Sequence, residues 1–227
     1  MTGRKLAAIA AIICCAVATI VVTAIVVVPG SSKPAATVQD APEKLPKLKP
    51  ILLDREEVSA LVGKSVKKTI EGNSLGQPAG PDYAVVPAAC TSVGFFGQAV
   101  TYRNVAWEVA RATQYSALGV EVSQSIVLTA SPPLAEAFLT EQGKQWQKCL
   151  GVRYRFGTYT PDESVVTDVR IGDGRITADT QQASTGLGKC VHVMEVHEAY
   201  VVEAVTCGFP PVDANALADE IIARIPK

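Results

Sequence analysis

The sequence predicts an α+β domain in which helices flank a twisted antiparallel sheet, with two disulfides and a single transmembrane helix before it. Three observations support this fold class: strand-like runs are joined by short turns, the helical segments are amphipathic, and four cysteines lie outside one long apolar segment. Short turns join antiparallel strands, whereas parallel strands need long crossovers. Hairpins outnumber crossovers here, so the sheet is expected to be antiparallel.

The apolar segment runs from Leu6 to Val28 and contains no charged residue. A helix of this length exceeds the roughly 30 Å hydrocarbon core of a bilayer, so it can span a membrane with some tilt. Arg4 and Lys5 directly precede it, and the positive-inside rule places them in the cytoplasm. We therefore expect a single-pass protein of the cell membrane, with residues 1–5 cytoplasmic, residues 6–28 as the membrane anchor, and the C-terminal domain extracytoplasmic.

A cleaved signal peptide and a lipidated cysteine are the alternatives for this segment. A cleaved signal has an apolar core of roughly 7 to 15 residues followed by small residues, whereas this run is longer and ends in Val-Val-Val-Pro-Gly. Cys14 and Cys15 lie inside the run, where cysteine usually acts as a small hydrophobe, and Ala-Ile-Ile before Cys14 lacks the small residues of a lipidation site. A retained anchor is the preferred interpretation.

Residues 29–50 contain many prolines and lysines and no large apolar cluster. Proline favours extended geometry, so this segment predicts a linker that holds the domain away from the membrane. Residues 51–227 are enough for one domain with a substantial core. The formal net charge of −1 provides no basic stripe for phosphates, so nucleic acid is not an expected partner.

Cysteine usage indicates an oxidising compartment. Of the six cysteines, two lie in the apolar segment, and the other four are Cys90, Cys149, Cys190 and Cys207. An even number in an exported domain predicts disulfides. Zinc is the alternative, but no C-x-x-C pair occurs and neither histidine has a recognisable ligand spacing. We predict no metal site and no cofactor.

A predicted hairpin determines the disulfide pairing. Residues 189–197 and 200–207 are valine-rich runs separated by a Glu-Ala dipeptide. With that dipeptide as the loop, counting back along both strands places Cys190 opposite Cys207 at a non-hydrogen-bonded pair, where Cα atoms are about 4.5 Å apart. Glu-Ala is not a favoured turn, but a longer loop with the same centre keeps this pairing. By elimination, the other two cysteines form the second bond.

Three amphipathic helices are predicted, with Asp54, Ser131 and Asp213 as their N-caps. The first ends at Gly63, and two prolines follow Ser131 in the first turn of the second. The aromatic residues of the second helix belong to an inward stripe, and aromatics at this spacing are usually core residues rather than the lining of a cleft. The stripe consists of Ala135, Phe138, Gln142, Trp146 and Cys149.

The remaining runs with strand character surround a loop. Residues 73–87 are dense in glycine and proline and predict an extended surface loop. Asp173-Gly174 is a strong hairpin signal between two of the later strands. The predicted strands are 105–109, 120–129, 152–156, 164–171 and 175–183, in addition to the two strands of the hairpin.

One set of residues carries a family resemblance: Leu52, Leu53, Cys90, Trp107, Ala135, Phe138, Trp146, Cys149, Cys190, Cys207 and Gly208, together with the aliphatic terminal helix. Over residues 51–227 the chain resembles the extracytoplasmic sensor domain of mycobacterial receptor serine/threonine kinases of the PknH type, which many mycobacterial membrane proteins and lipoproteins also carry. The resemblance implies an antiparallel sheet flanked by helices, the disulfide pairing given above, a cleft for an extracellular ligand and no catalytic residues. Kinase members have a catalytic domain before the membrane segment, and residues 1–5 leave no room for one, so direct kinase signalling is not expected.

The sequence provides little for catalysis but suggests one binding pair. His192 and His197 are the only histidines, their odd separation on one strand points them to opposite faces, and no G-x-S-x-G, H-E-x-x-H or P-loop sequence occurs. In the predicted hairpin, His192 lies diagonal to Glu203 on the face that carries Cys190. This pair is the candidate ligand-binding site, because a histidine beside a carboxylate can hold a polar group or sense pH. The alternatives are a surface ion pair or a hydrogen-bonded histidine under a helix.

The favoured function is a non-enzymatic, sensor-like domain that binds an unidentified small molecule or envelope ligand in a cleft. A protein-interaction or structural component of the cell envelope is the second hypothesis, with a possible protein partner. A hydrolase without a recognisable motif is the third. A deep cleft with convergent polar groups favours the first hypothesis, and a flat exposed apolar patch favours the second.

Overall fold

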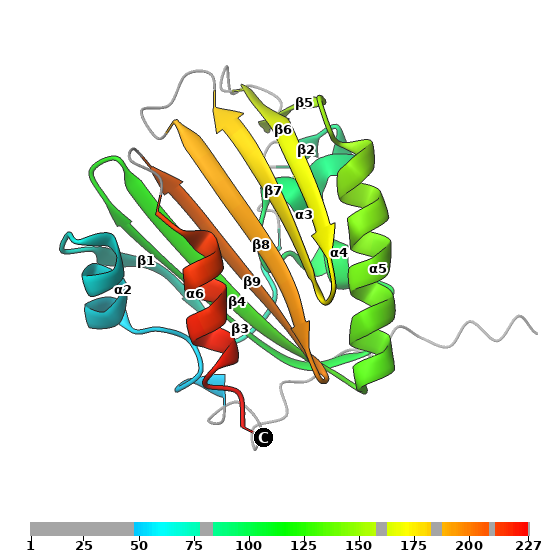
Figure 1. Cartoon of the computed structure of the whole chain (residues 1–227), viewed down its shortest axis with the longest axis horizontal. Helices are drawn as coiled ribbons and strands as arrows, with labels where there is room; N and C mark the ends of the chain where they lie inside the picture. Colours follow the sequence, from blue (N-terminus) through cyan, green and yellow to red (C-terminus); the bar gives the residue numbers. More distant parts are fainter. Residues whose placement is uncertain (1–47, 78–83, 158–162, 183–187, 209–211, 227) are drawn as a thin grey trace, which may run out of the picture. The chain divides into compact units, whose positions relative to one another are not determined.

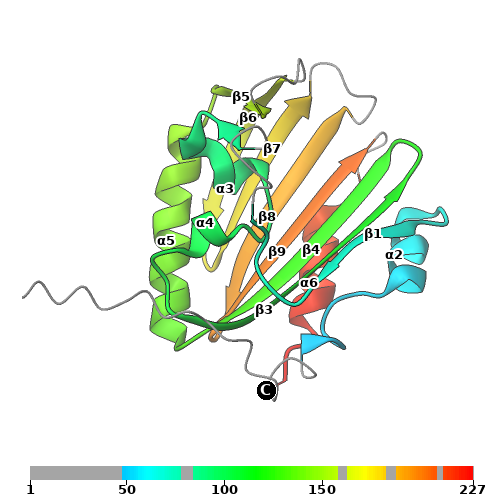
Figure 2. The same cartoon turned by 180° about the vertical axis from the view of Figure 1, so that it is seen from behind.

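The computed structural model describes residues 48–77, 84–157, 163–182, 188–208 and 212–226. These residues form an α+β fold around one twisted, nine-stranded sheet with helices on both faces (Figure 1, Figure 2). The predicted anchor and nearly all of the predicted linker lie outside the described residues. Within the described ranges, no helix has the length and apolar character needed to cross a membrane.

All neighbouring strands of the sheet are antiparallel, as the short turns in the sequence predicted. Their order across the sheet is β1-β3-β4-β9-β8-β7-β6-β5-β2. The strands are β1 (Lys67–Gly72), β2 (Val85–Val86), β3 (Trp107–Ala117), β4 (Val120–Thr129), β5 (Arg153–Phe156), β6 (Glu163–Gly172), β7 (Arg175–Gln182), β8 (Lys189–His197) and β9 (Tyr200–Gly208).

The two edge strands are the ones that the sequence did not predict. Strand β1 pairs only with β3, and its side chains are mostly exposed, so it lacks the alternation of apolar and polar residues that marks a half-buried strand. Strand β2 has two residues and pairs with β5. The expected loop over residues 73–87 is therefore interrupted near its end by a short strand.

Helices cover both faces of the sheet (Figure 1, Figure 2). On one face lie α2 (Arg55–Val62) and α6 (Ala214–Ile222). On the other lie α3 (Thr91–Gly94), α4 (Ala99–Tyr102) and α5 (Pro132–Lys148), with the 3-10 turn η2 (Ala88–Cys90) before α3.

Capping residues account for two of the three predicted helix starts. The Asp54 carboxylate accepts a hydrogen bond from the Glu57 N–H and Glu57 reciprocates, so α2 begins with a capping box. Asp213 accepts from the first backbone N–H groups of α6 in the same way. Ser131 is the N-cap residue of α5, as predicted, although its hydroxyl makes no cap hydrogen bond. The Ser131 carbonyl instead accepts from backbone N–H groups of the first turn.

Strand alternation divides the apolar residues between two cores, one on each face of the sheet. The first core packs α2 and α6 against β3, β4, β8 and β9, and it includes Leu48, so the packing begins before Ile51. The second core surrounds α5, where Trp146 is fully buried and Phe138 nearly so. Both aromatic residues are thus core residues, as their spacing indicated.

Both predicted disulfides are present. Cys190 faces Cys207 across β8 and β9 with Cα atoms 4.0 Å apart, and Cys90 bonds Cys149 at the C-terminal end of α5 with Cα atoms 5.8 Å apart. The hairpin has the expected register because Glu198 adopts φ of 52°, which allows a Glu-Ala dipeptide to close a tight loop.

Candidate functional site

A cleft of about 650 Å³ lies on the α5 face of the sheet. Its floor is formed by side chains of β3, β4, β9, β8 and β7, and its opposite wall by residues 74–77 and 93–98. Tyr154 and Phe156 of β5 line it as well. The volume is within the range of small-molecule sites in proteins.

The side chains of this sheet face change in character along each central strand, which explains why the cleft is open. Toward one end the face is apolar and α5 packs on it; toward the other end it carries small or polar residues, on which a helix gains little by packing. The residues under α5 include Val127, Ile176, Met194 and Val201, and their counterparts in the cleft include Ser123, Thr180, His192 and Val205.

The predicted pair of His192 and Glu203 meets inside the protein beside the cleft. The two side chains are 2% and 1% exposed, and His192 Nε2 lies 3.1 Å from Glu203 Oε2. His192 contributes to the cleft lining, whereas Glu203 lies behind it. The indole of Trp146 packs on the imidazole with ring centroids 4.6 Å apart. The pair is therefore not a surface ion pair; His192 is a hydrogen-bonded histidine under helix α5.

This buried pair also holds the cleft wall formed by residues 93–98. His192 Nδ1 lies 3.2 Å from the carbonyl oxygen of Val93. Because a carbonyl oxygen can only accept, Nδ1 is the donor of this hydrogen bond. The backbone N–H of Gly97 donates to Glu203 Oε1 at 2.9 Å. Gly97 has φ of 56°, a conformation that favours glycine, and this conformation presents its N–H to the carboxylate. Both ends of the wall are thus tied to adjacent strands of the floor.

Further hydrogen-bond donors lie beside the Glu203 carboxylate. The Tyr102 hydroxyl donates to Glu203 Oε1 at 2.7 Å, and Ser125 Oγ lies 3.4 Å from the same atom. Burial, with the nearby charge of Glu203, raises the pKa of Tyr102 well above its usual value, so this phenol stays protonated and remains a donor. Both ring nitrogens of His192 have hydrogen-bond partners within the protein. The imidazole ring therefore lines the cleft without offering a free nitrogen to a ligand.

Several cleft residues were not predicted as site residues. The aromatic side chains Phe95 and Phe156 contact one another with centroids 4.4 Å apart, and Gln114 and Ser123 line the floor. One signal was present in the sequence: serine and glutamine occupy strand positions that alternate in phase with core residues. Neither Trp107 nor Trp146 lines the cleft.

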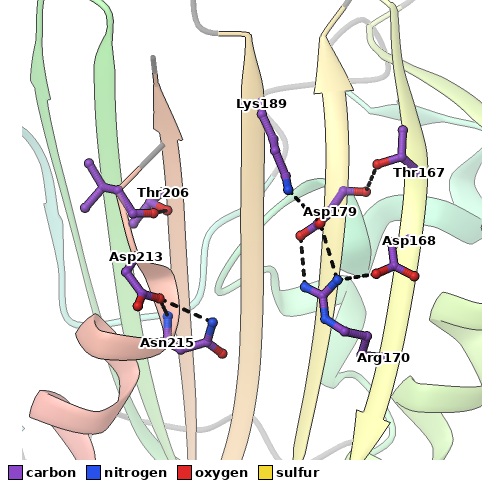
Figure 3. Close-up of polar contacts among 9 residues, drawn as sticks. Thr167, Asp168, Arg170, Asp179, Lys189, Thr206, Asp213 and Asn215 are labelled. Atoms are coloured by element: carbon purple, nitrogen blue, oxygen red, sulfur yellow. Dashed lines mark hydrogen bonds and ion pairs between the residues drawn. The ribbon is translucent and has the colours of Figure 1, made fainter. Parts of the chain in front are cut away.

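The opposite face carries a smaller groove of about 310 Å³ between α6 and the strands β7 and β8. Figure 3 shows its polar residues: Asp179 lies between Arg170 and Lys189, with hydrogen-bond or ion-pair distances of 3.0 and 2.7 Å. Arg170 also pairs with Asp168. Since these charges are paired with one another, we interpret the cluster as structural, and the cleft is the better candidate site.

This cluster predicts a pH-dependent contribution to stability. Burial alone would raise the pKa of Asp179, but hydrogen bonds from Arg170 and Lys189 outweigh it and lower the pKa below its usual value. An acid with a lowered pKa in the folded state stabilises the fold above its unfolded pKa of about 3.9, and this contribution is lost as pH falls through the folded value. Asp179→Asn should therefore reduce the free energy of unfolding by about 1 kcal/mol at pH 7, with the difference from wild type shrinking as the pH falls below the unfolded pKa of about 3.9.

Urea titrations between pH 2.5 and pH 7 test this expectation. Asp168→Asn is the matched control, since it touches the same arginine from a half-exposed position, and it should change stability by less than about 0.5 kcal/mol. A difference between Asp179→Asn and wild type that is independent of pH would contradict the assignment.

Within the described part of the chain, no group of three or more His, Cys, Asp or Glu side chains is arranged to hold a metal ion. The cleft has a wall and floor built from paired and buried groups, and no nucleophile paired with a base is apparent among its described residues. The fold and cleft define a disulfide-braced α+β domain with a cleft on one face of its sheet.

The chain belongs to the PknH-like extracellular domain family, whose sequence profile matches residues 45–224. This is a family of non-catalytic, sensor-like domains, and it indicates an extracytoplasmic location. The family assignment confirms the resemblance inferred from the cysteines and helix residues. Among curated proteins, none matches this chain in sequence.

A solved crystal structure supports the fold. The crystal structure of the extracellular domain of PknH from Mycobacterium tuberculosis is similar with a TM-score of 0.70 and 21% sequence identity, covering 82% of this chain and 97% of that one. A putative uncharacterised protein from Mycobacterium smegmatis, the Rv0999 ortholog, matches with a TM-score of 0.34 and 15% identity, covering 70% of this chain and 85% of that one.

Proposed function

We propose that this protein is a membrane-anchored, extracytoplasmic sensor-like domain that binds a small molecule or envelope ligand in the cleft on the α5 face. Residues 6–28 are the proposed anchor and residues 29–50 the proposed linker. The observation that supports ligand binding is the cleft itself, about 650 Å³ with an aromatic side and several polar groups on its floor. Small-molecule sites typically combine an apolar lining with a few placed polar groups.

His192 and Glu203 are part of the proposed site through the wall that they hold. The pair fixes Val93 and Gly97, which lie at either side of Phe95 and Phe96 in the wall. A ligand that pushes on this wall would act on a hydrogen-bonded network that is closed to water. We infer that these two residues position the wall, and that ligand occupancy is transmitted to the sheet through them.

Filling the cleft should abolish ligand binding. Val205 lies on the floor, so Val205→Trp would occupy the space that a ligand needs. The full chain, purified in detergent, would be incubated with an extract of the cell envelope and examined by native mass spectrometry. We expect a bound small molecule on the wild-type protein and none on the Val205→Trp variant.

The matched control is Leu134→Trp, which adds the same side chain at a position on α5 that is 40% exposed and outside the cleft. This variant should retain the bound molecule. A wild-type protein that captures no small molecule, or a molecule that stays bound to the Val205→Trp variant, would contradict the proposed function.

A further inference from the structure

The charge of the cleft lining restricts the chemistry of its ligand. Among the described residues that line the cleft there is no lysine, arginine or aspartate. Apart from tyrosine, its titratable side chains there are Glu121 and His192, and both nitrogens of His192 are used within the protein. An anionic ligand would therefore find no lysine or arginine to pair with in the part of the lining that the structure describes, and burying an unpaired carboxylate or phosphate costs several kcal/mol.

The polar side chains of the floor include Gln114, Glu121 and Ser123 on β3 and β4, with Thr180 and Gln182 on β7. Four of these five are uncharged amides or hydroxyls, which suit an uncharged ligand. Gln114 lies opposite Ser123 in the sheet, and burial raises the pKa of the Glu121 carboxyl above its usual value. Ser123 is 1% exposed and lines the cleft, so its hydroxyl is placed to pair with a polar group of the ligand.

An aromatic surface lies at the opposite end, several strands away. Phe156 contacts Phe95 and, with ring centroids 5.7 Å apart, Tyr154, so these three rings form one aromatic surface. Between the two ends the floor carries Val205 and the Cys190–Cys207 disulfide, which are also apolar. The described lining thus joins an aromatic surface at one end to the amide and hydroxyl side chains of β3 and β4 at the other.

From this arrangement we infer that the cleft selects an uncharged amphiphile. Its hydroxyl-bearing end lies over Ser123 and Gln114, and its hydrocarbon or aromatic body lies against Phe95 and Phe156. The inference rests on the proposed function, because it specifies the class of molecule that the same cleft binds. It separates this protein from binders of fatty acids and anionic phospholipids, whose head groups carry a net negative charge.

Three probes with one skeleton test the class of ligand: 6-phenyl-1-hexanol, 6-phenylhexanoate and 6-phenylhexylammonium. Binding would be measured by isothermal titration calorimetry on the full chain in lipid nanodiscs at pH 7, with the heats of empty nanodiscs subtracted. We expect the alcohol to bind at least about tenfold more tightly than the carboxylate. The free energy that corresponds to a tenfold difference in affinity is a modest fraction of the cost of burying an unpaired charge. The alcohol should also bind more tightly than the ammonium.

Ser123→Ala should weaken binding of the alcohol by about three- to tenfold, as expected for one lost hydrogen bond. Ser131→Ala is the matched control, because that hydroxyl lies at the start of α5 and outside the cleft. It should leave the affinity unchanged.

The possible results distinguish this inference from the proposed function. Equal binding of all three probes, or tighter binding of the carboxylate or the ammonium, would overturn the ligand class while the cleft remains a binding site. If no probe binds the wild-type protein more tightly than it binds the Val205→Trp variant, the proposed function fails and the ligand class fails with it.

Discussion

Replacing Glu203 with alanine is expected to reduce the free energy of unfolding by about 3 to 5 kcal/mol, because it removes one partner of a buried pair. Glu203 is 1% exposed and accepts hydrogen bonds from the Gly97 N–H and the Tyr102 hydroxyl. Alanine would leave both donors, and Nε2 of His192, without a partner in a buried site. The loss would be measured by urea titration of the full chain in nanodiscs, followed by tryptophan fluorescence.

The control is Glu203→Gln, which keeps the shape and the accepting carbonyl oxygen. Its carbonyl oxygen can still accept from the Gly97 N–H and the Tyr102 hydroxyl, and its NH₂ group takes the place of Oε2 beside His192 Nε2. We therefore expect a loss below about 2 kcal/mol. A loss as large as that of the alanine variant would show that the charge, rather than the hydrogen bonds, stabilises this site.

Variants of His192 and Glu203 should also change ligand affinity. His192→Ala and Glu203→Ala should weaken binding of the small molecule that the wild-type protein captures, because the wall formed by residues 93–98 loses its attachment. Tyr115→Phe is a suitable control, since its hydroxyl donates to the Leu53 carbonyl on the other face of the sheet. Unchanged affinity in the first two variants would remove His192 and Glu203 from the site.

The elements with strong local signals were predicted from sequence. The hairpin of β8 and β9 has two long valine-rich strands, so its register, and with it the Cys190–Cys207 bond, follows from counting along the strands. Helix α5 has an inward stripe that ends at Cys149 and matches the buried residues. In both cases the apolar periodicity lies within one continuous segment.

The elements that depend on distant contacts were not predicted. Strand β1 has mostly exposed side chains, and α3 and α4 span only residues 91–94 and 99–102, too short for a periodic pattern. The cleft depends on these segments, because residues 93–98 form its wall. His192 and Glu203 could be placed on one face from the hairpin, but their burial required α5 and this wall, which no local pattern indicates.

The second large effect is expected for the disulfide that joins η2 to α5. Removing it with the double change Cys90→Ala and Cys149→Ala should cost about 4 kcal/mol, because the bond closes a loop between residues separated by 59 positions. Removing the other bond with Cys190→Ala and Cys207→Ala should cost about 3 kcal/mol, because that separation is 17 positions. Replacing both cysteines of a bond avoids a free thiol in either variant.

The two disulfides should also differ in whether they stabilise the cleft wall formed by residues 93–98. Cys90 directly precedes α3, whose residue Val93 begins the cleft wall, so loss of the Cys90–Cys149 bond should raise amide hydrogen exchange at residues 91–97 as well as lower the global stability. Loss of the Cys190–Cys207 bond leaves the register of β8 and β9 fixed by backbone hydrogen bonds, so exchange in the wall should stay close to wild type. Urea titration and hydrogen exchange on the two double variants measure both effects. If the wall exchanges equally fast in both, then α3 and the wall are held by the sheet, through His192 and Glu203, rather than by the bond to α5.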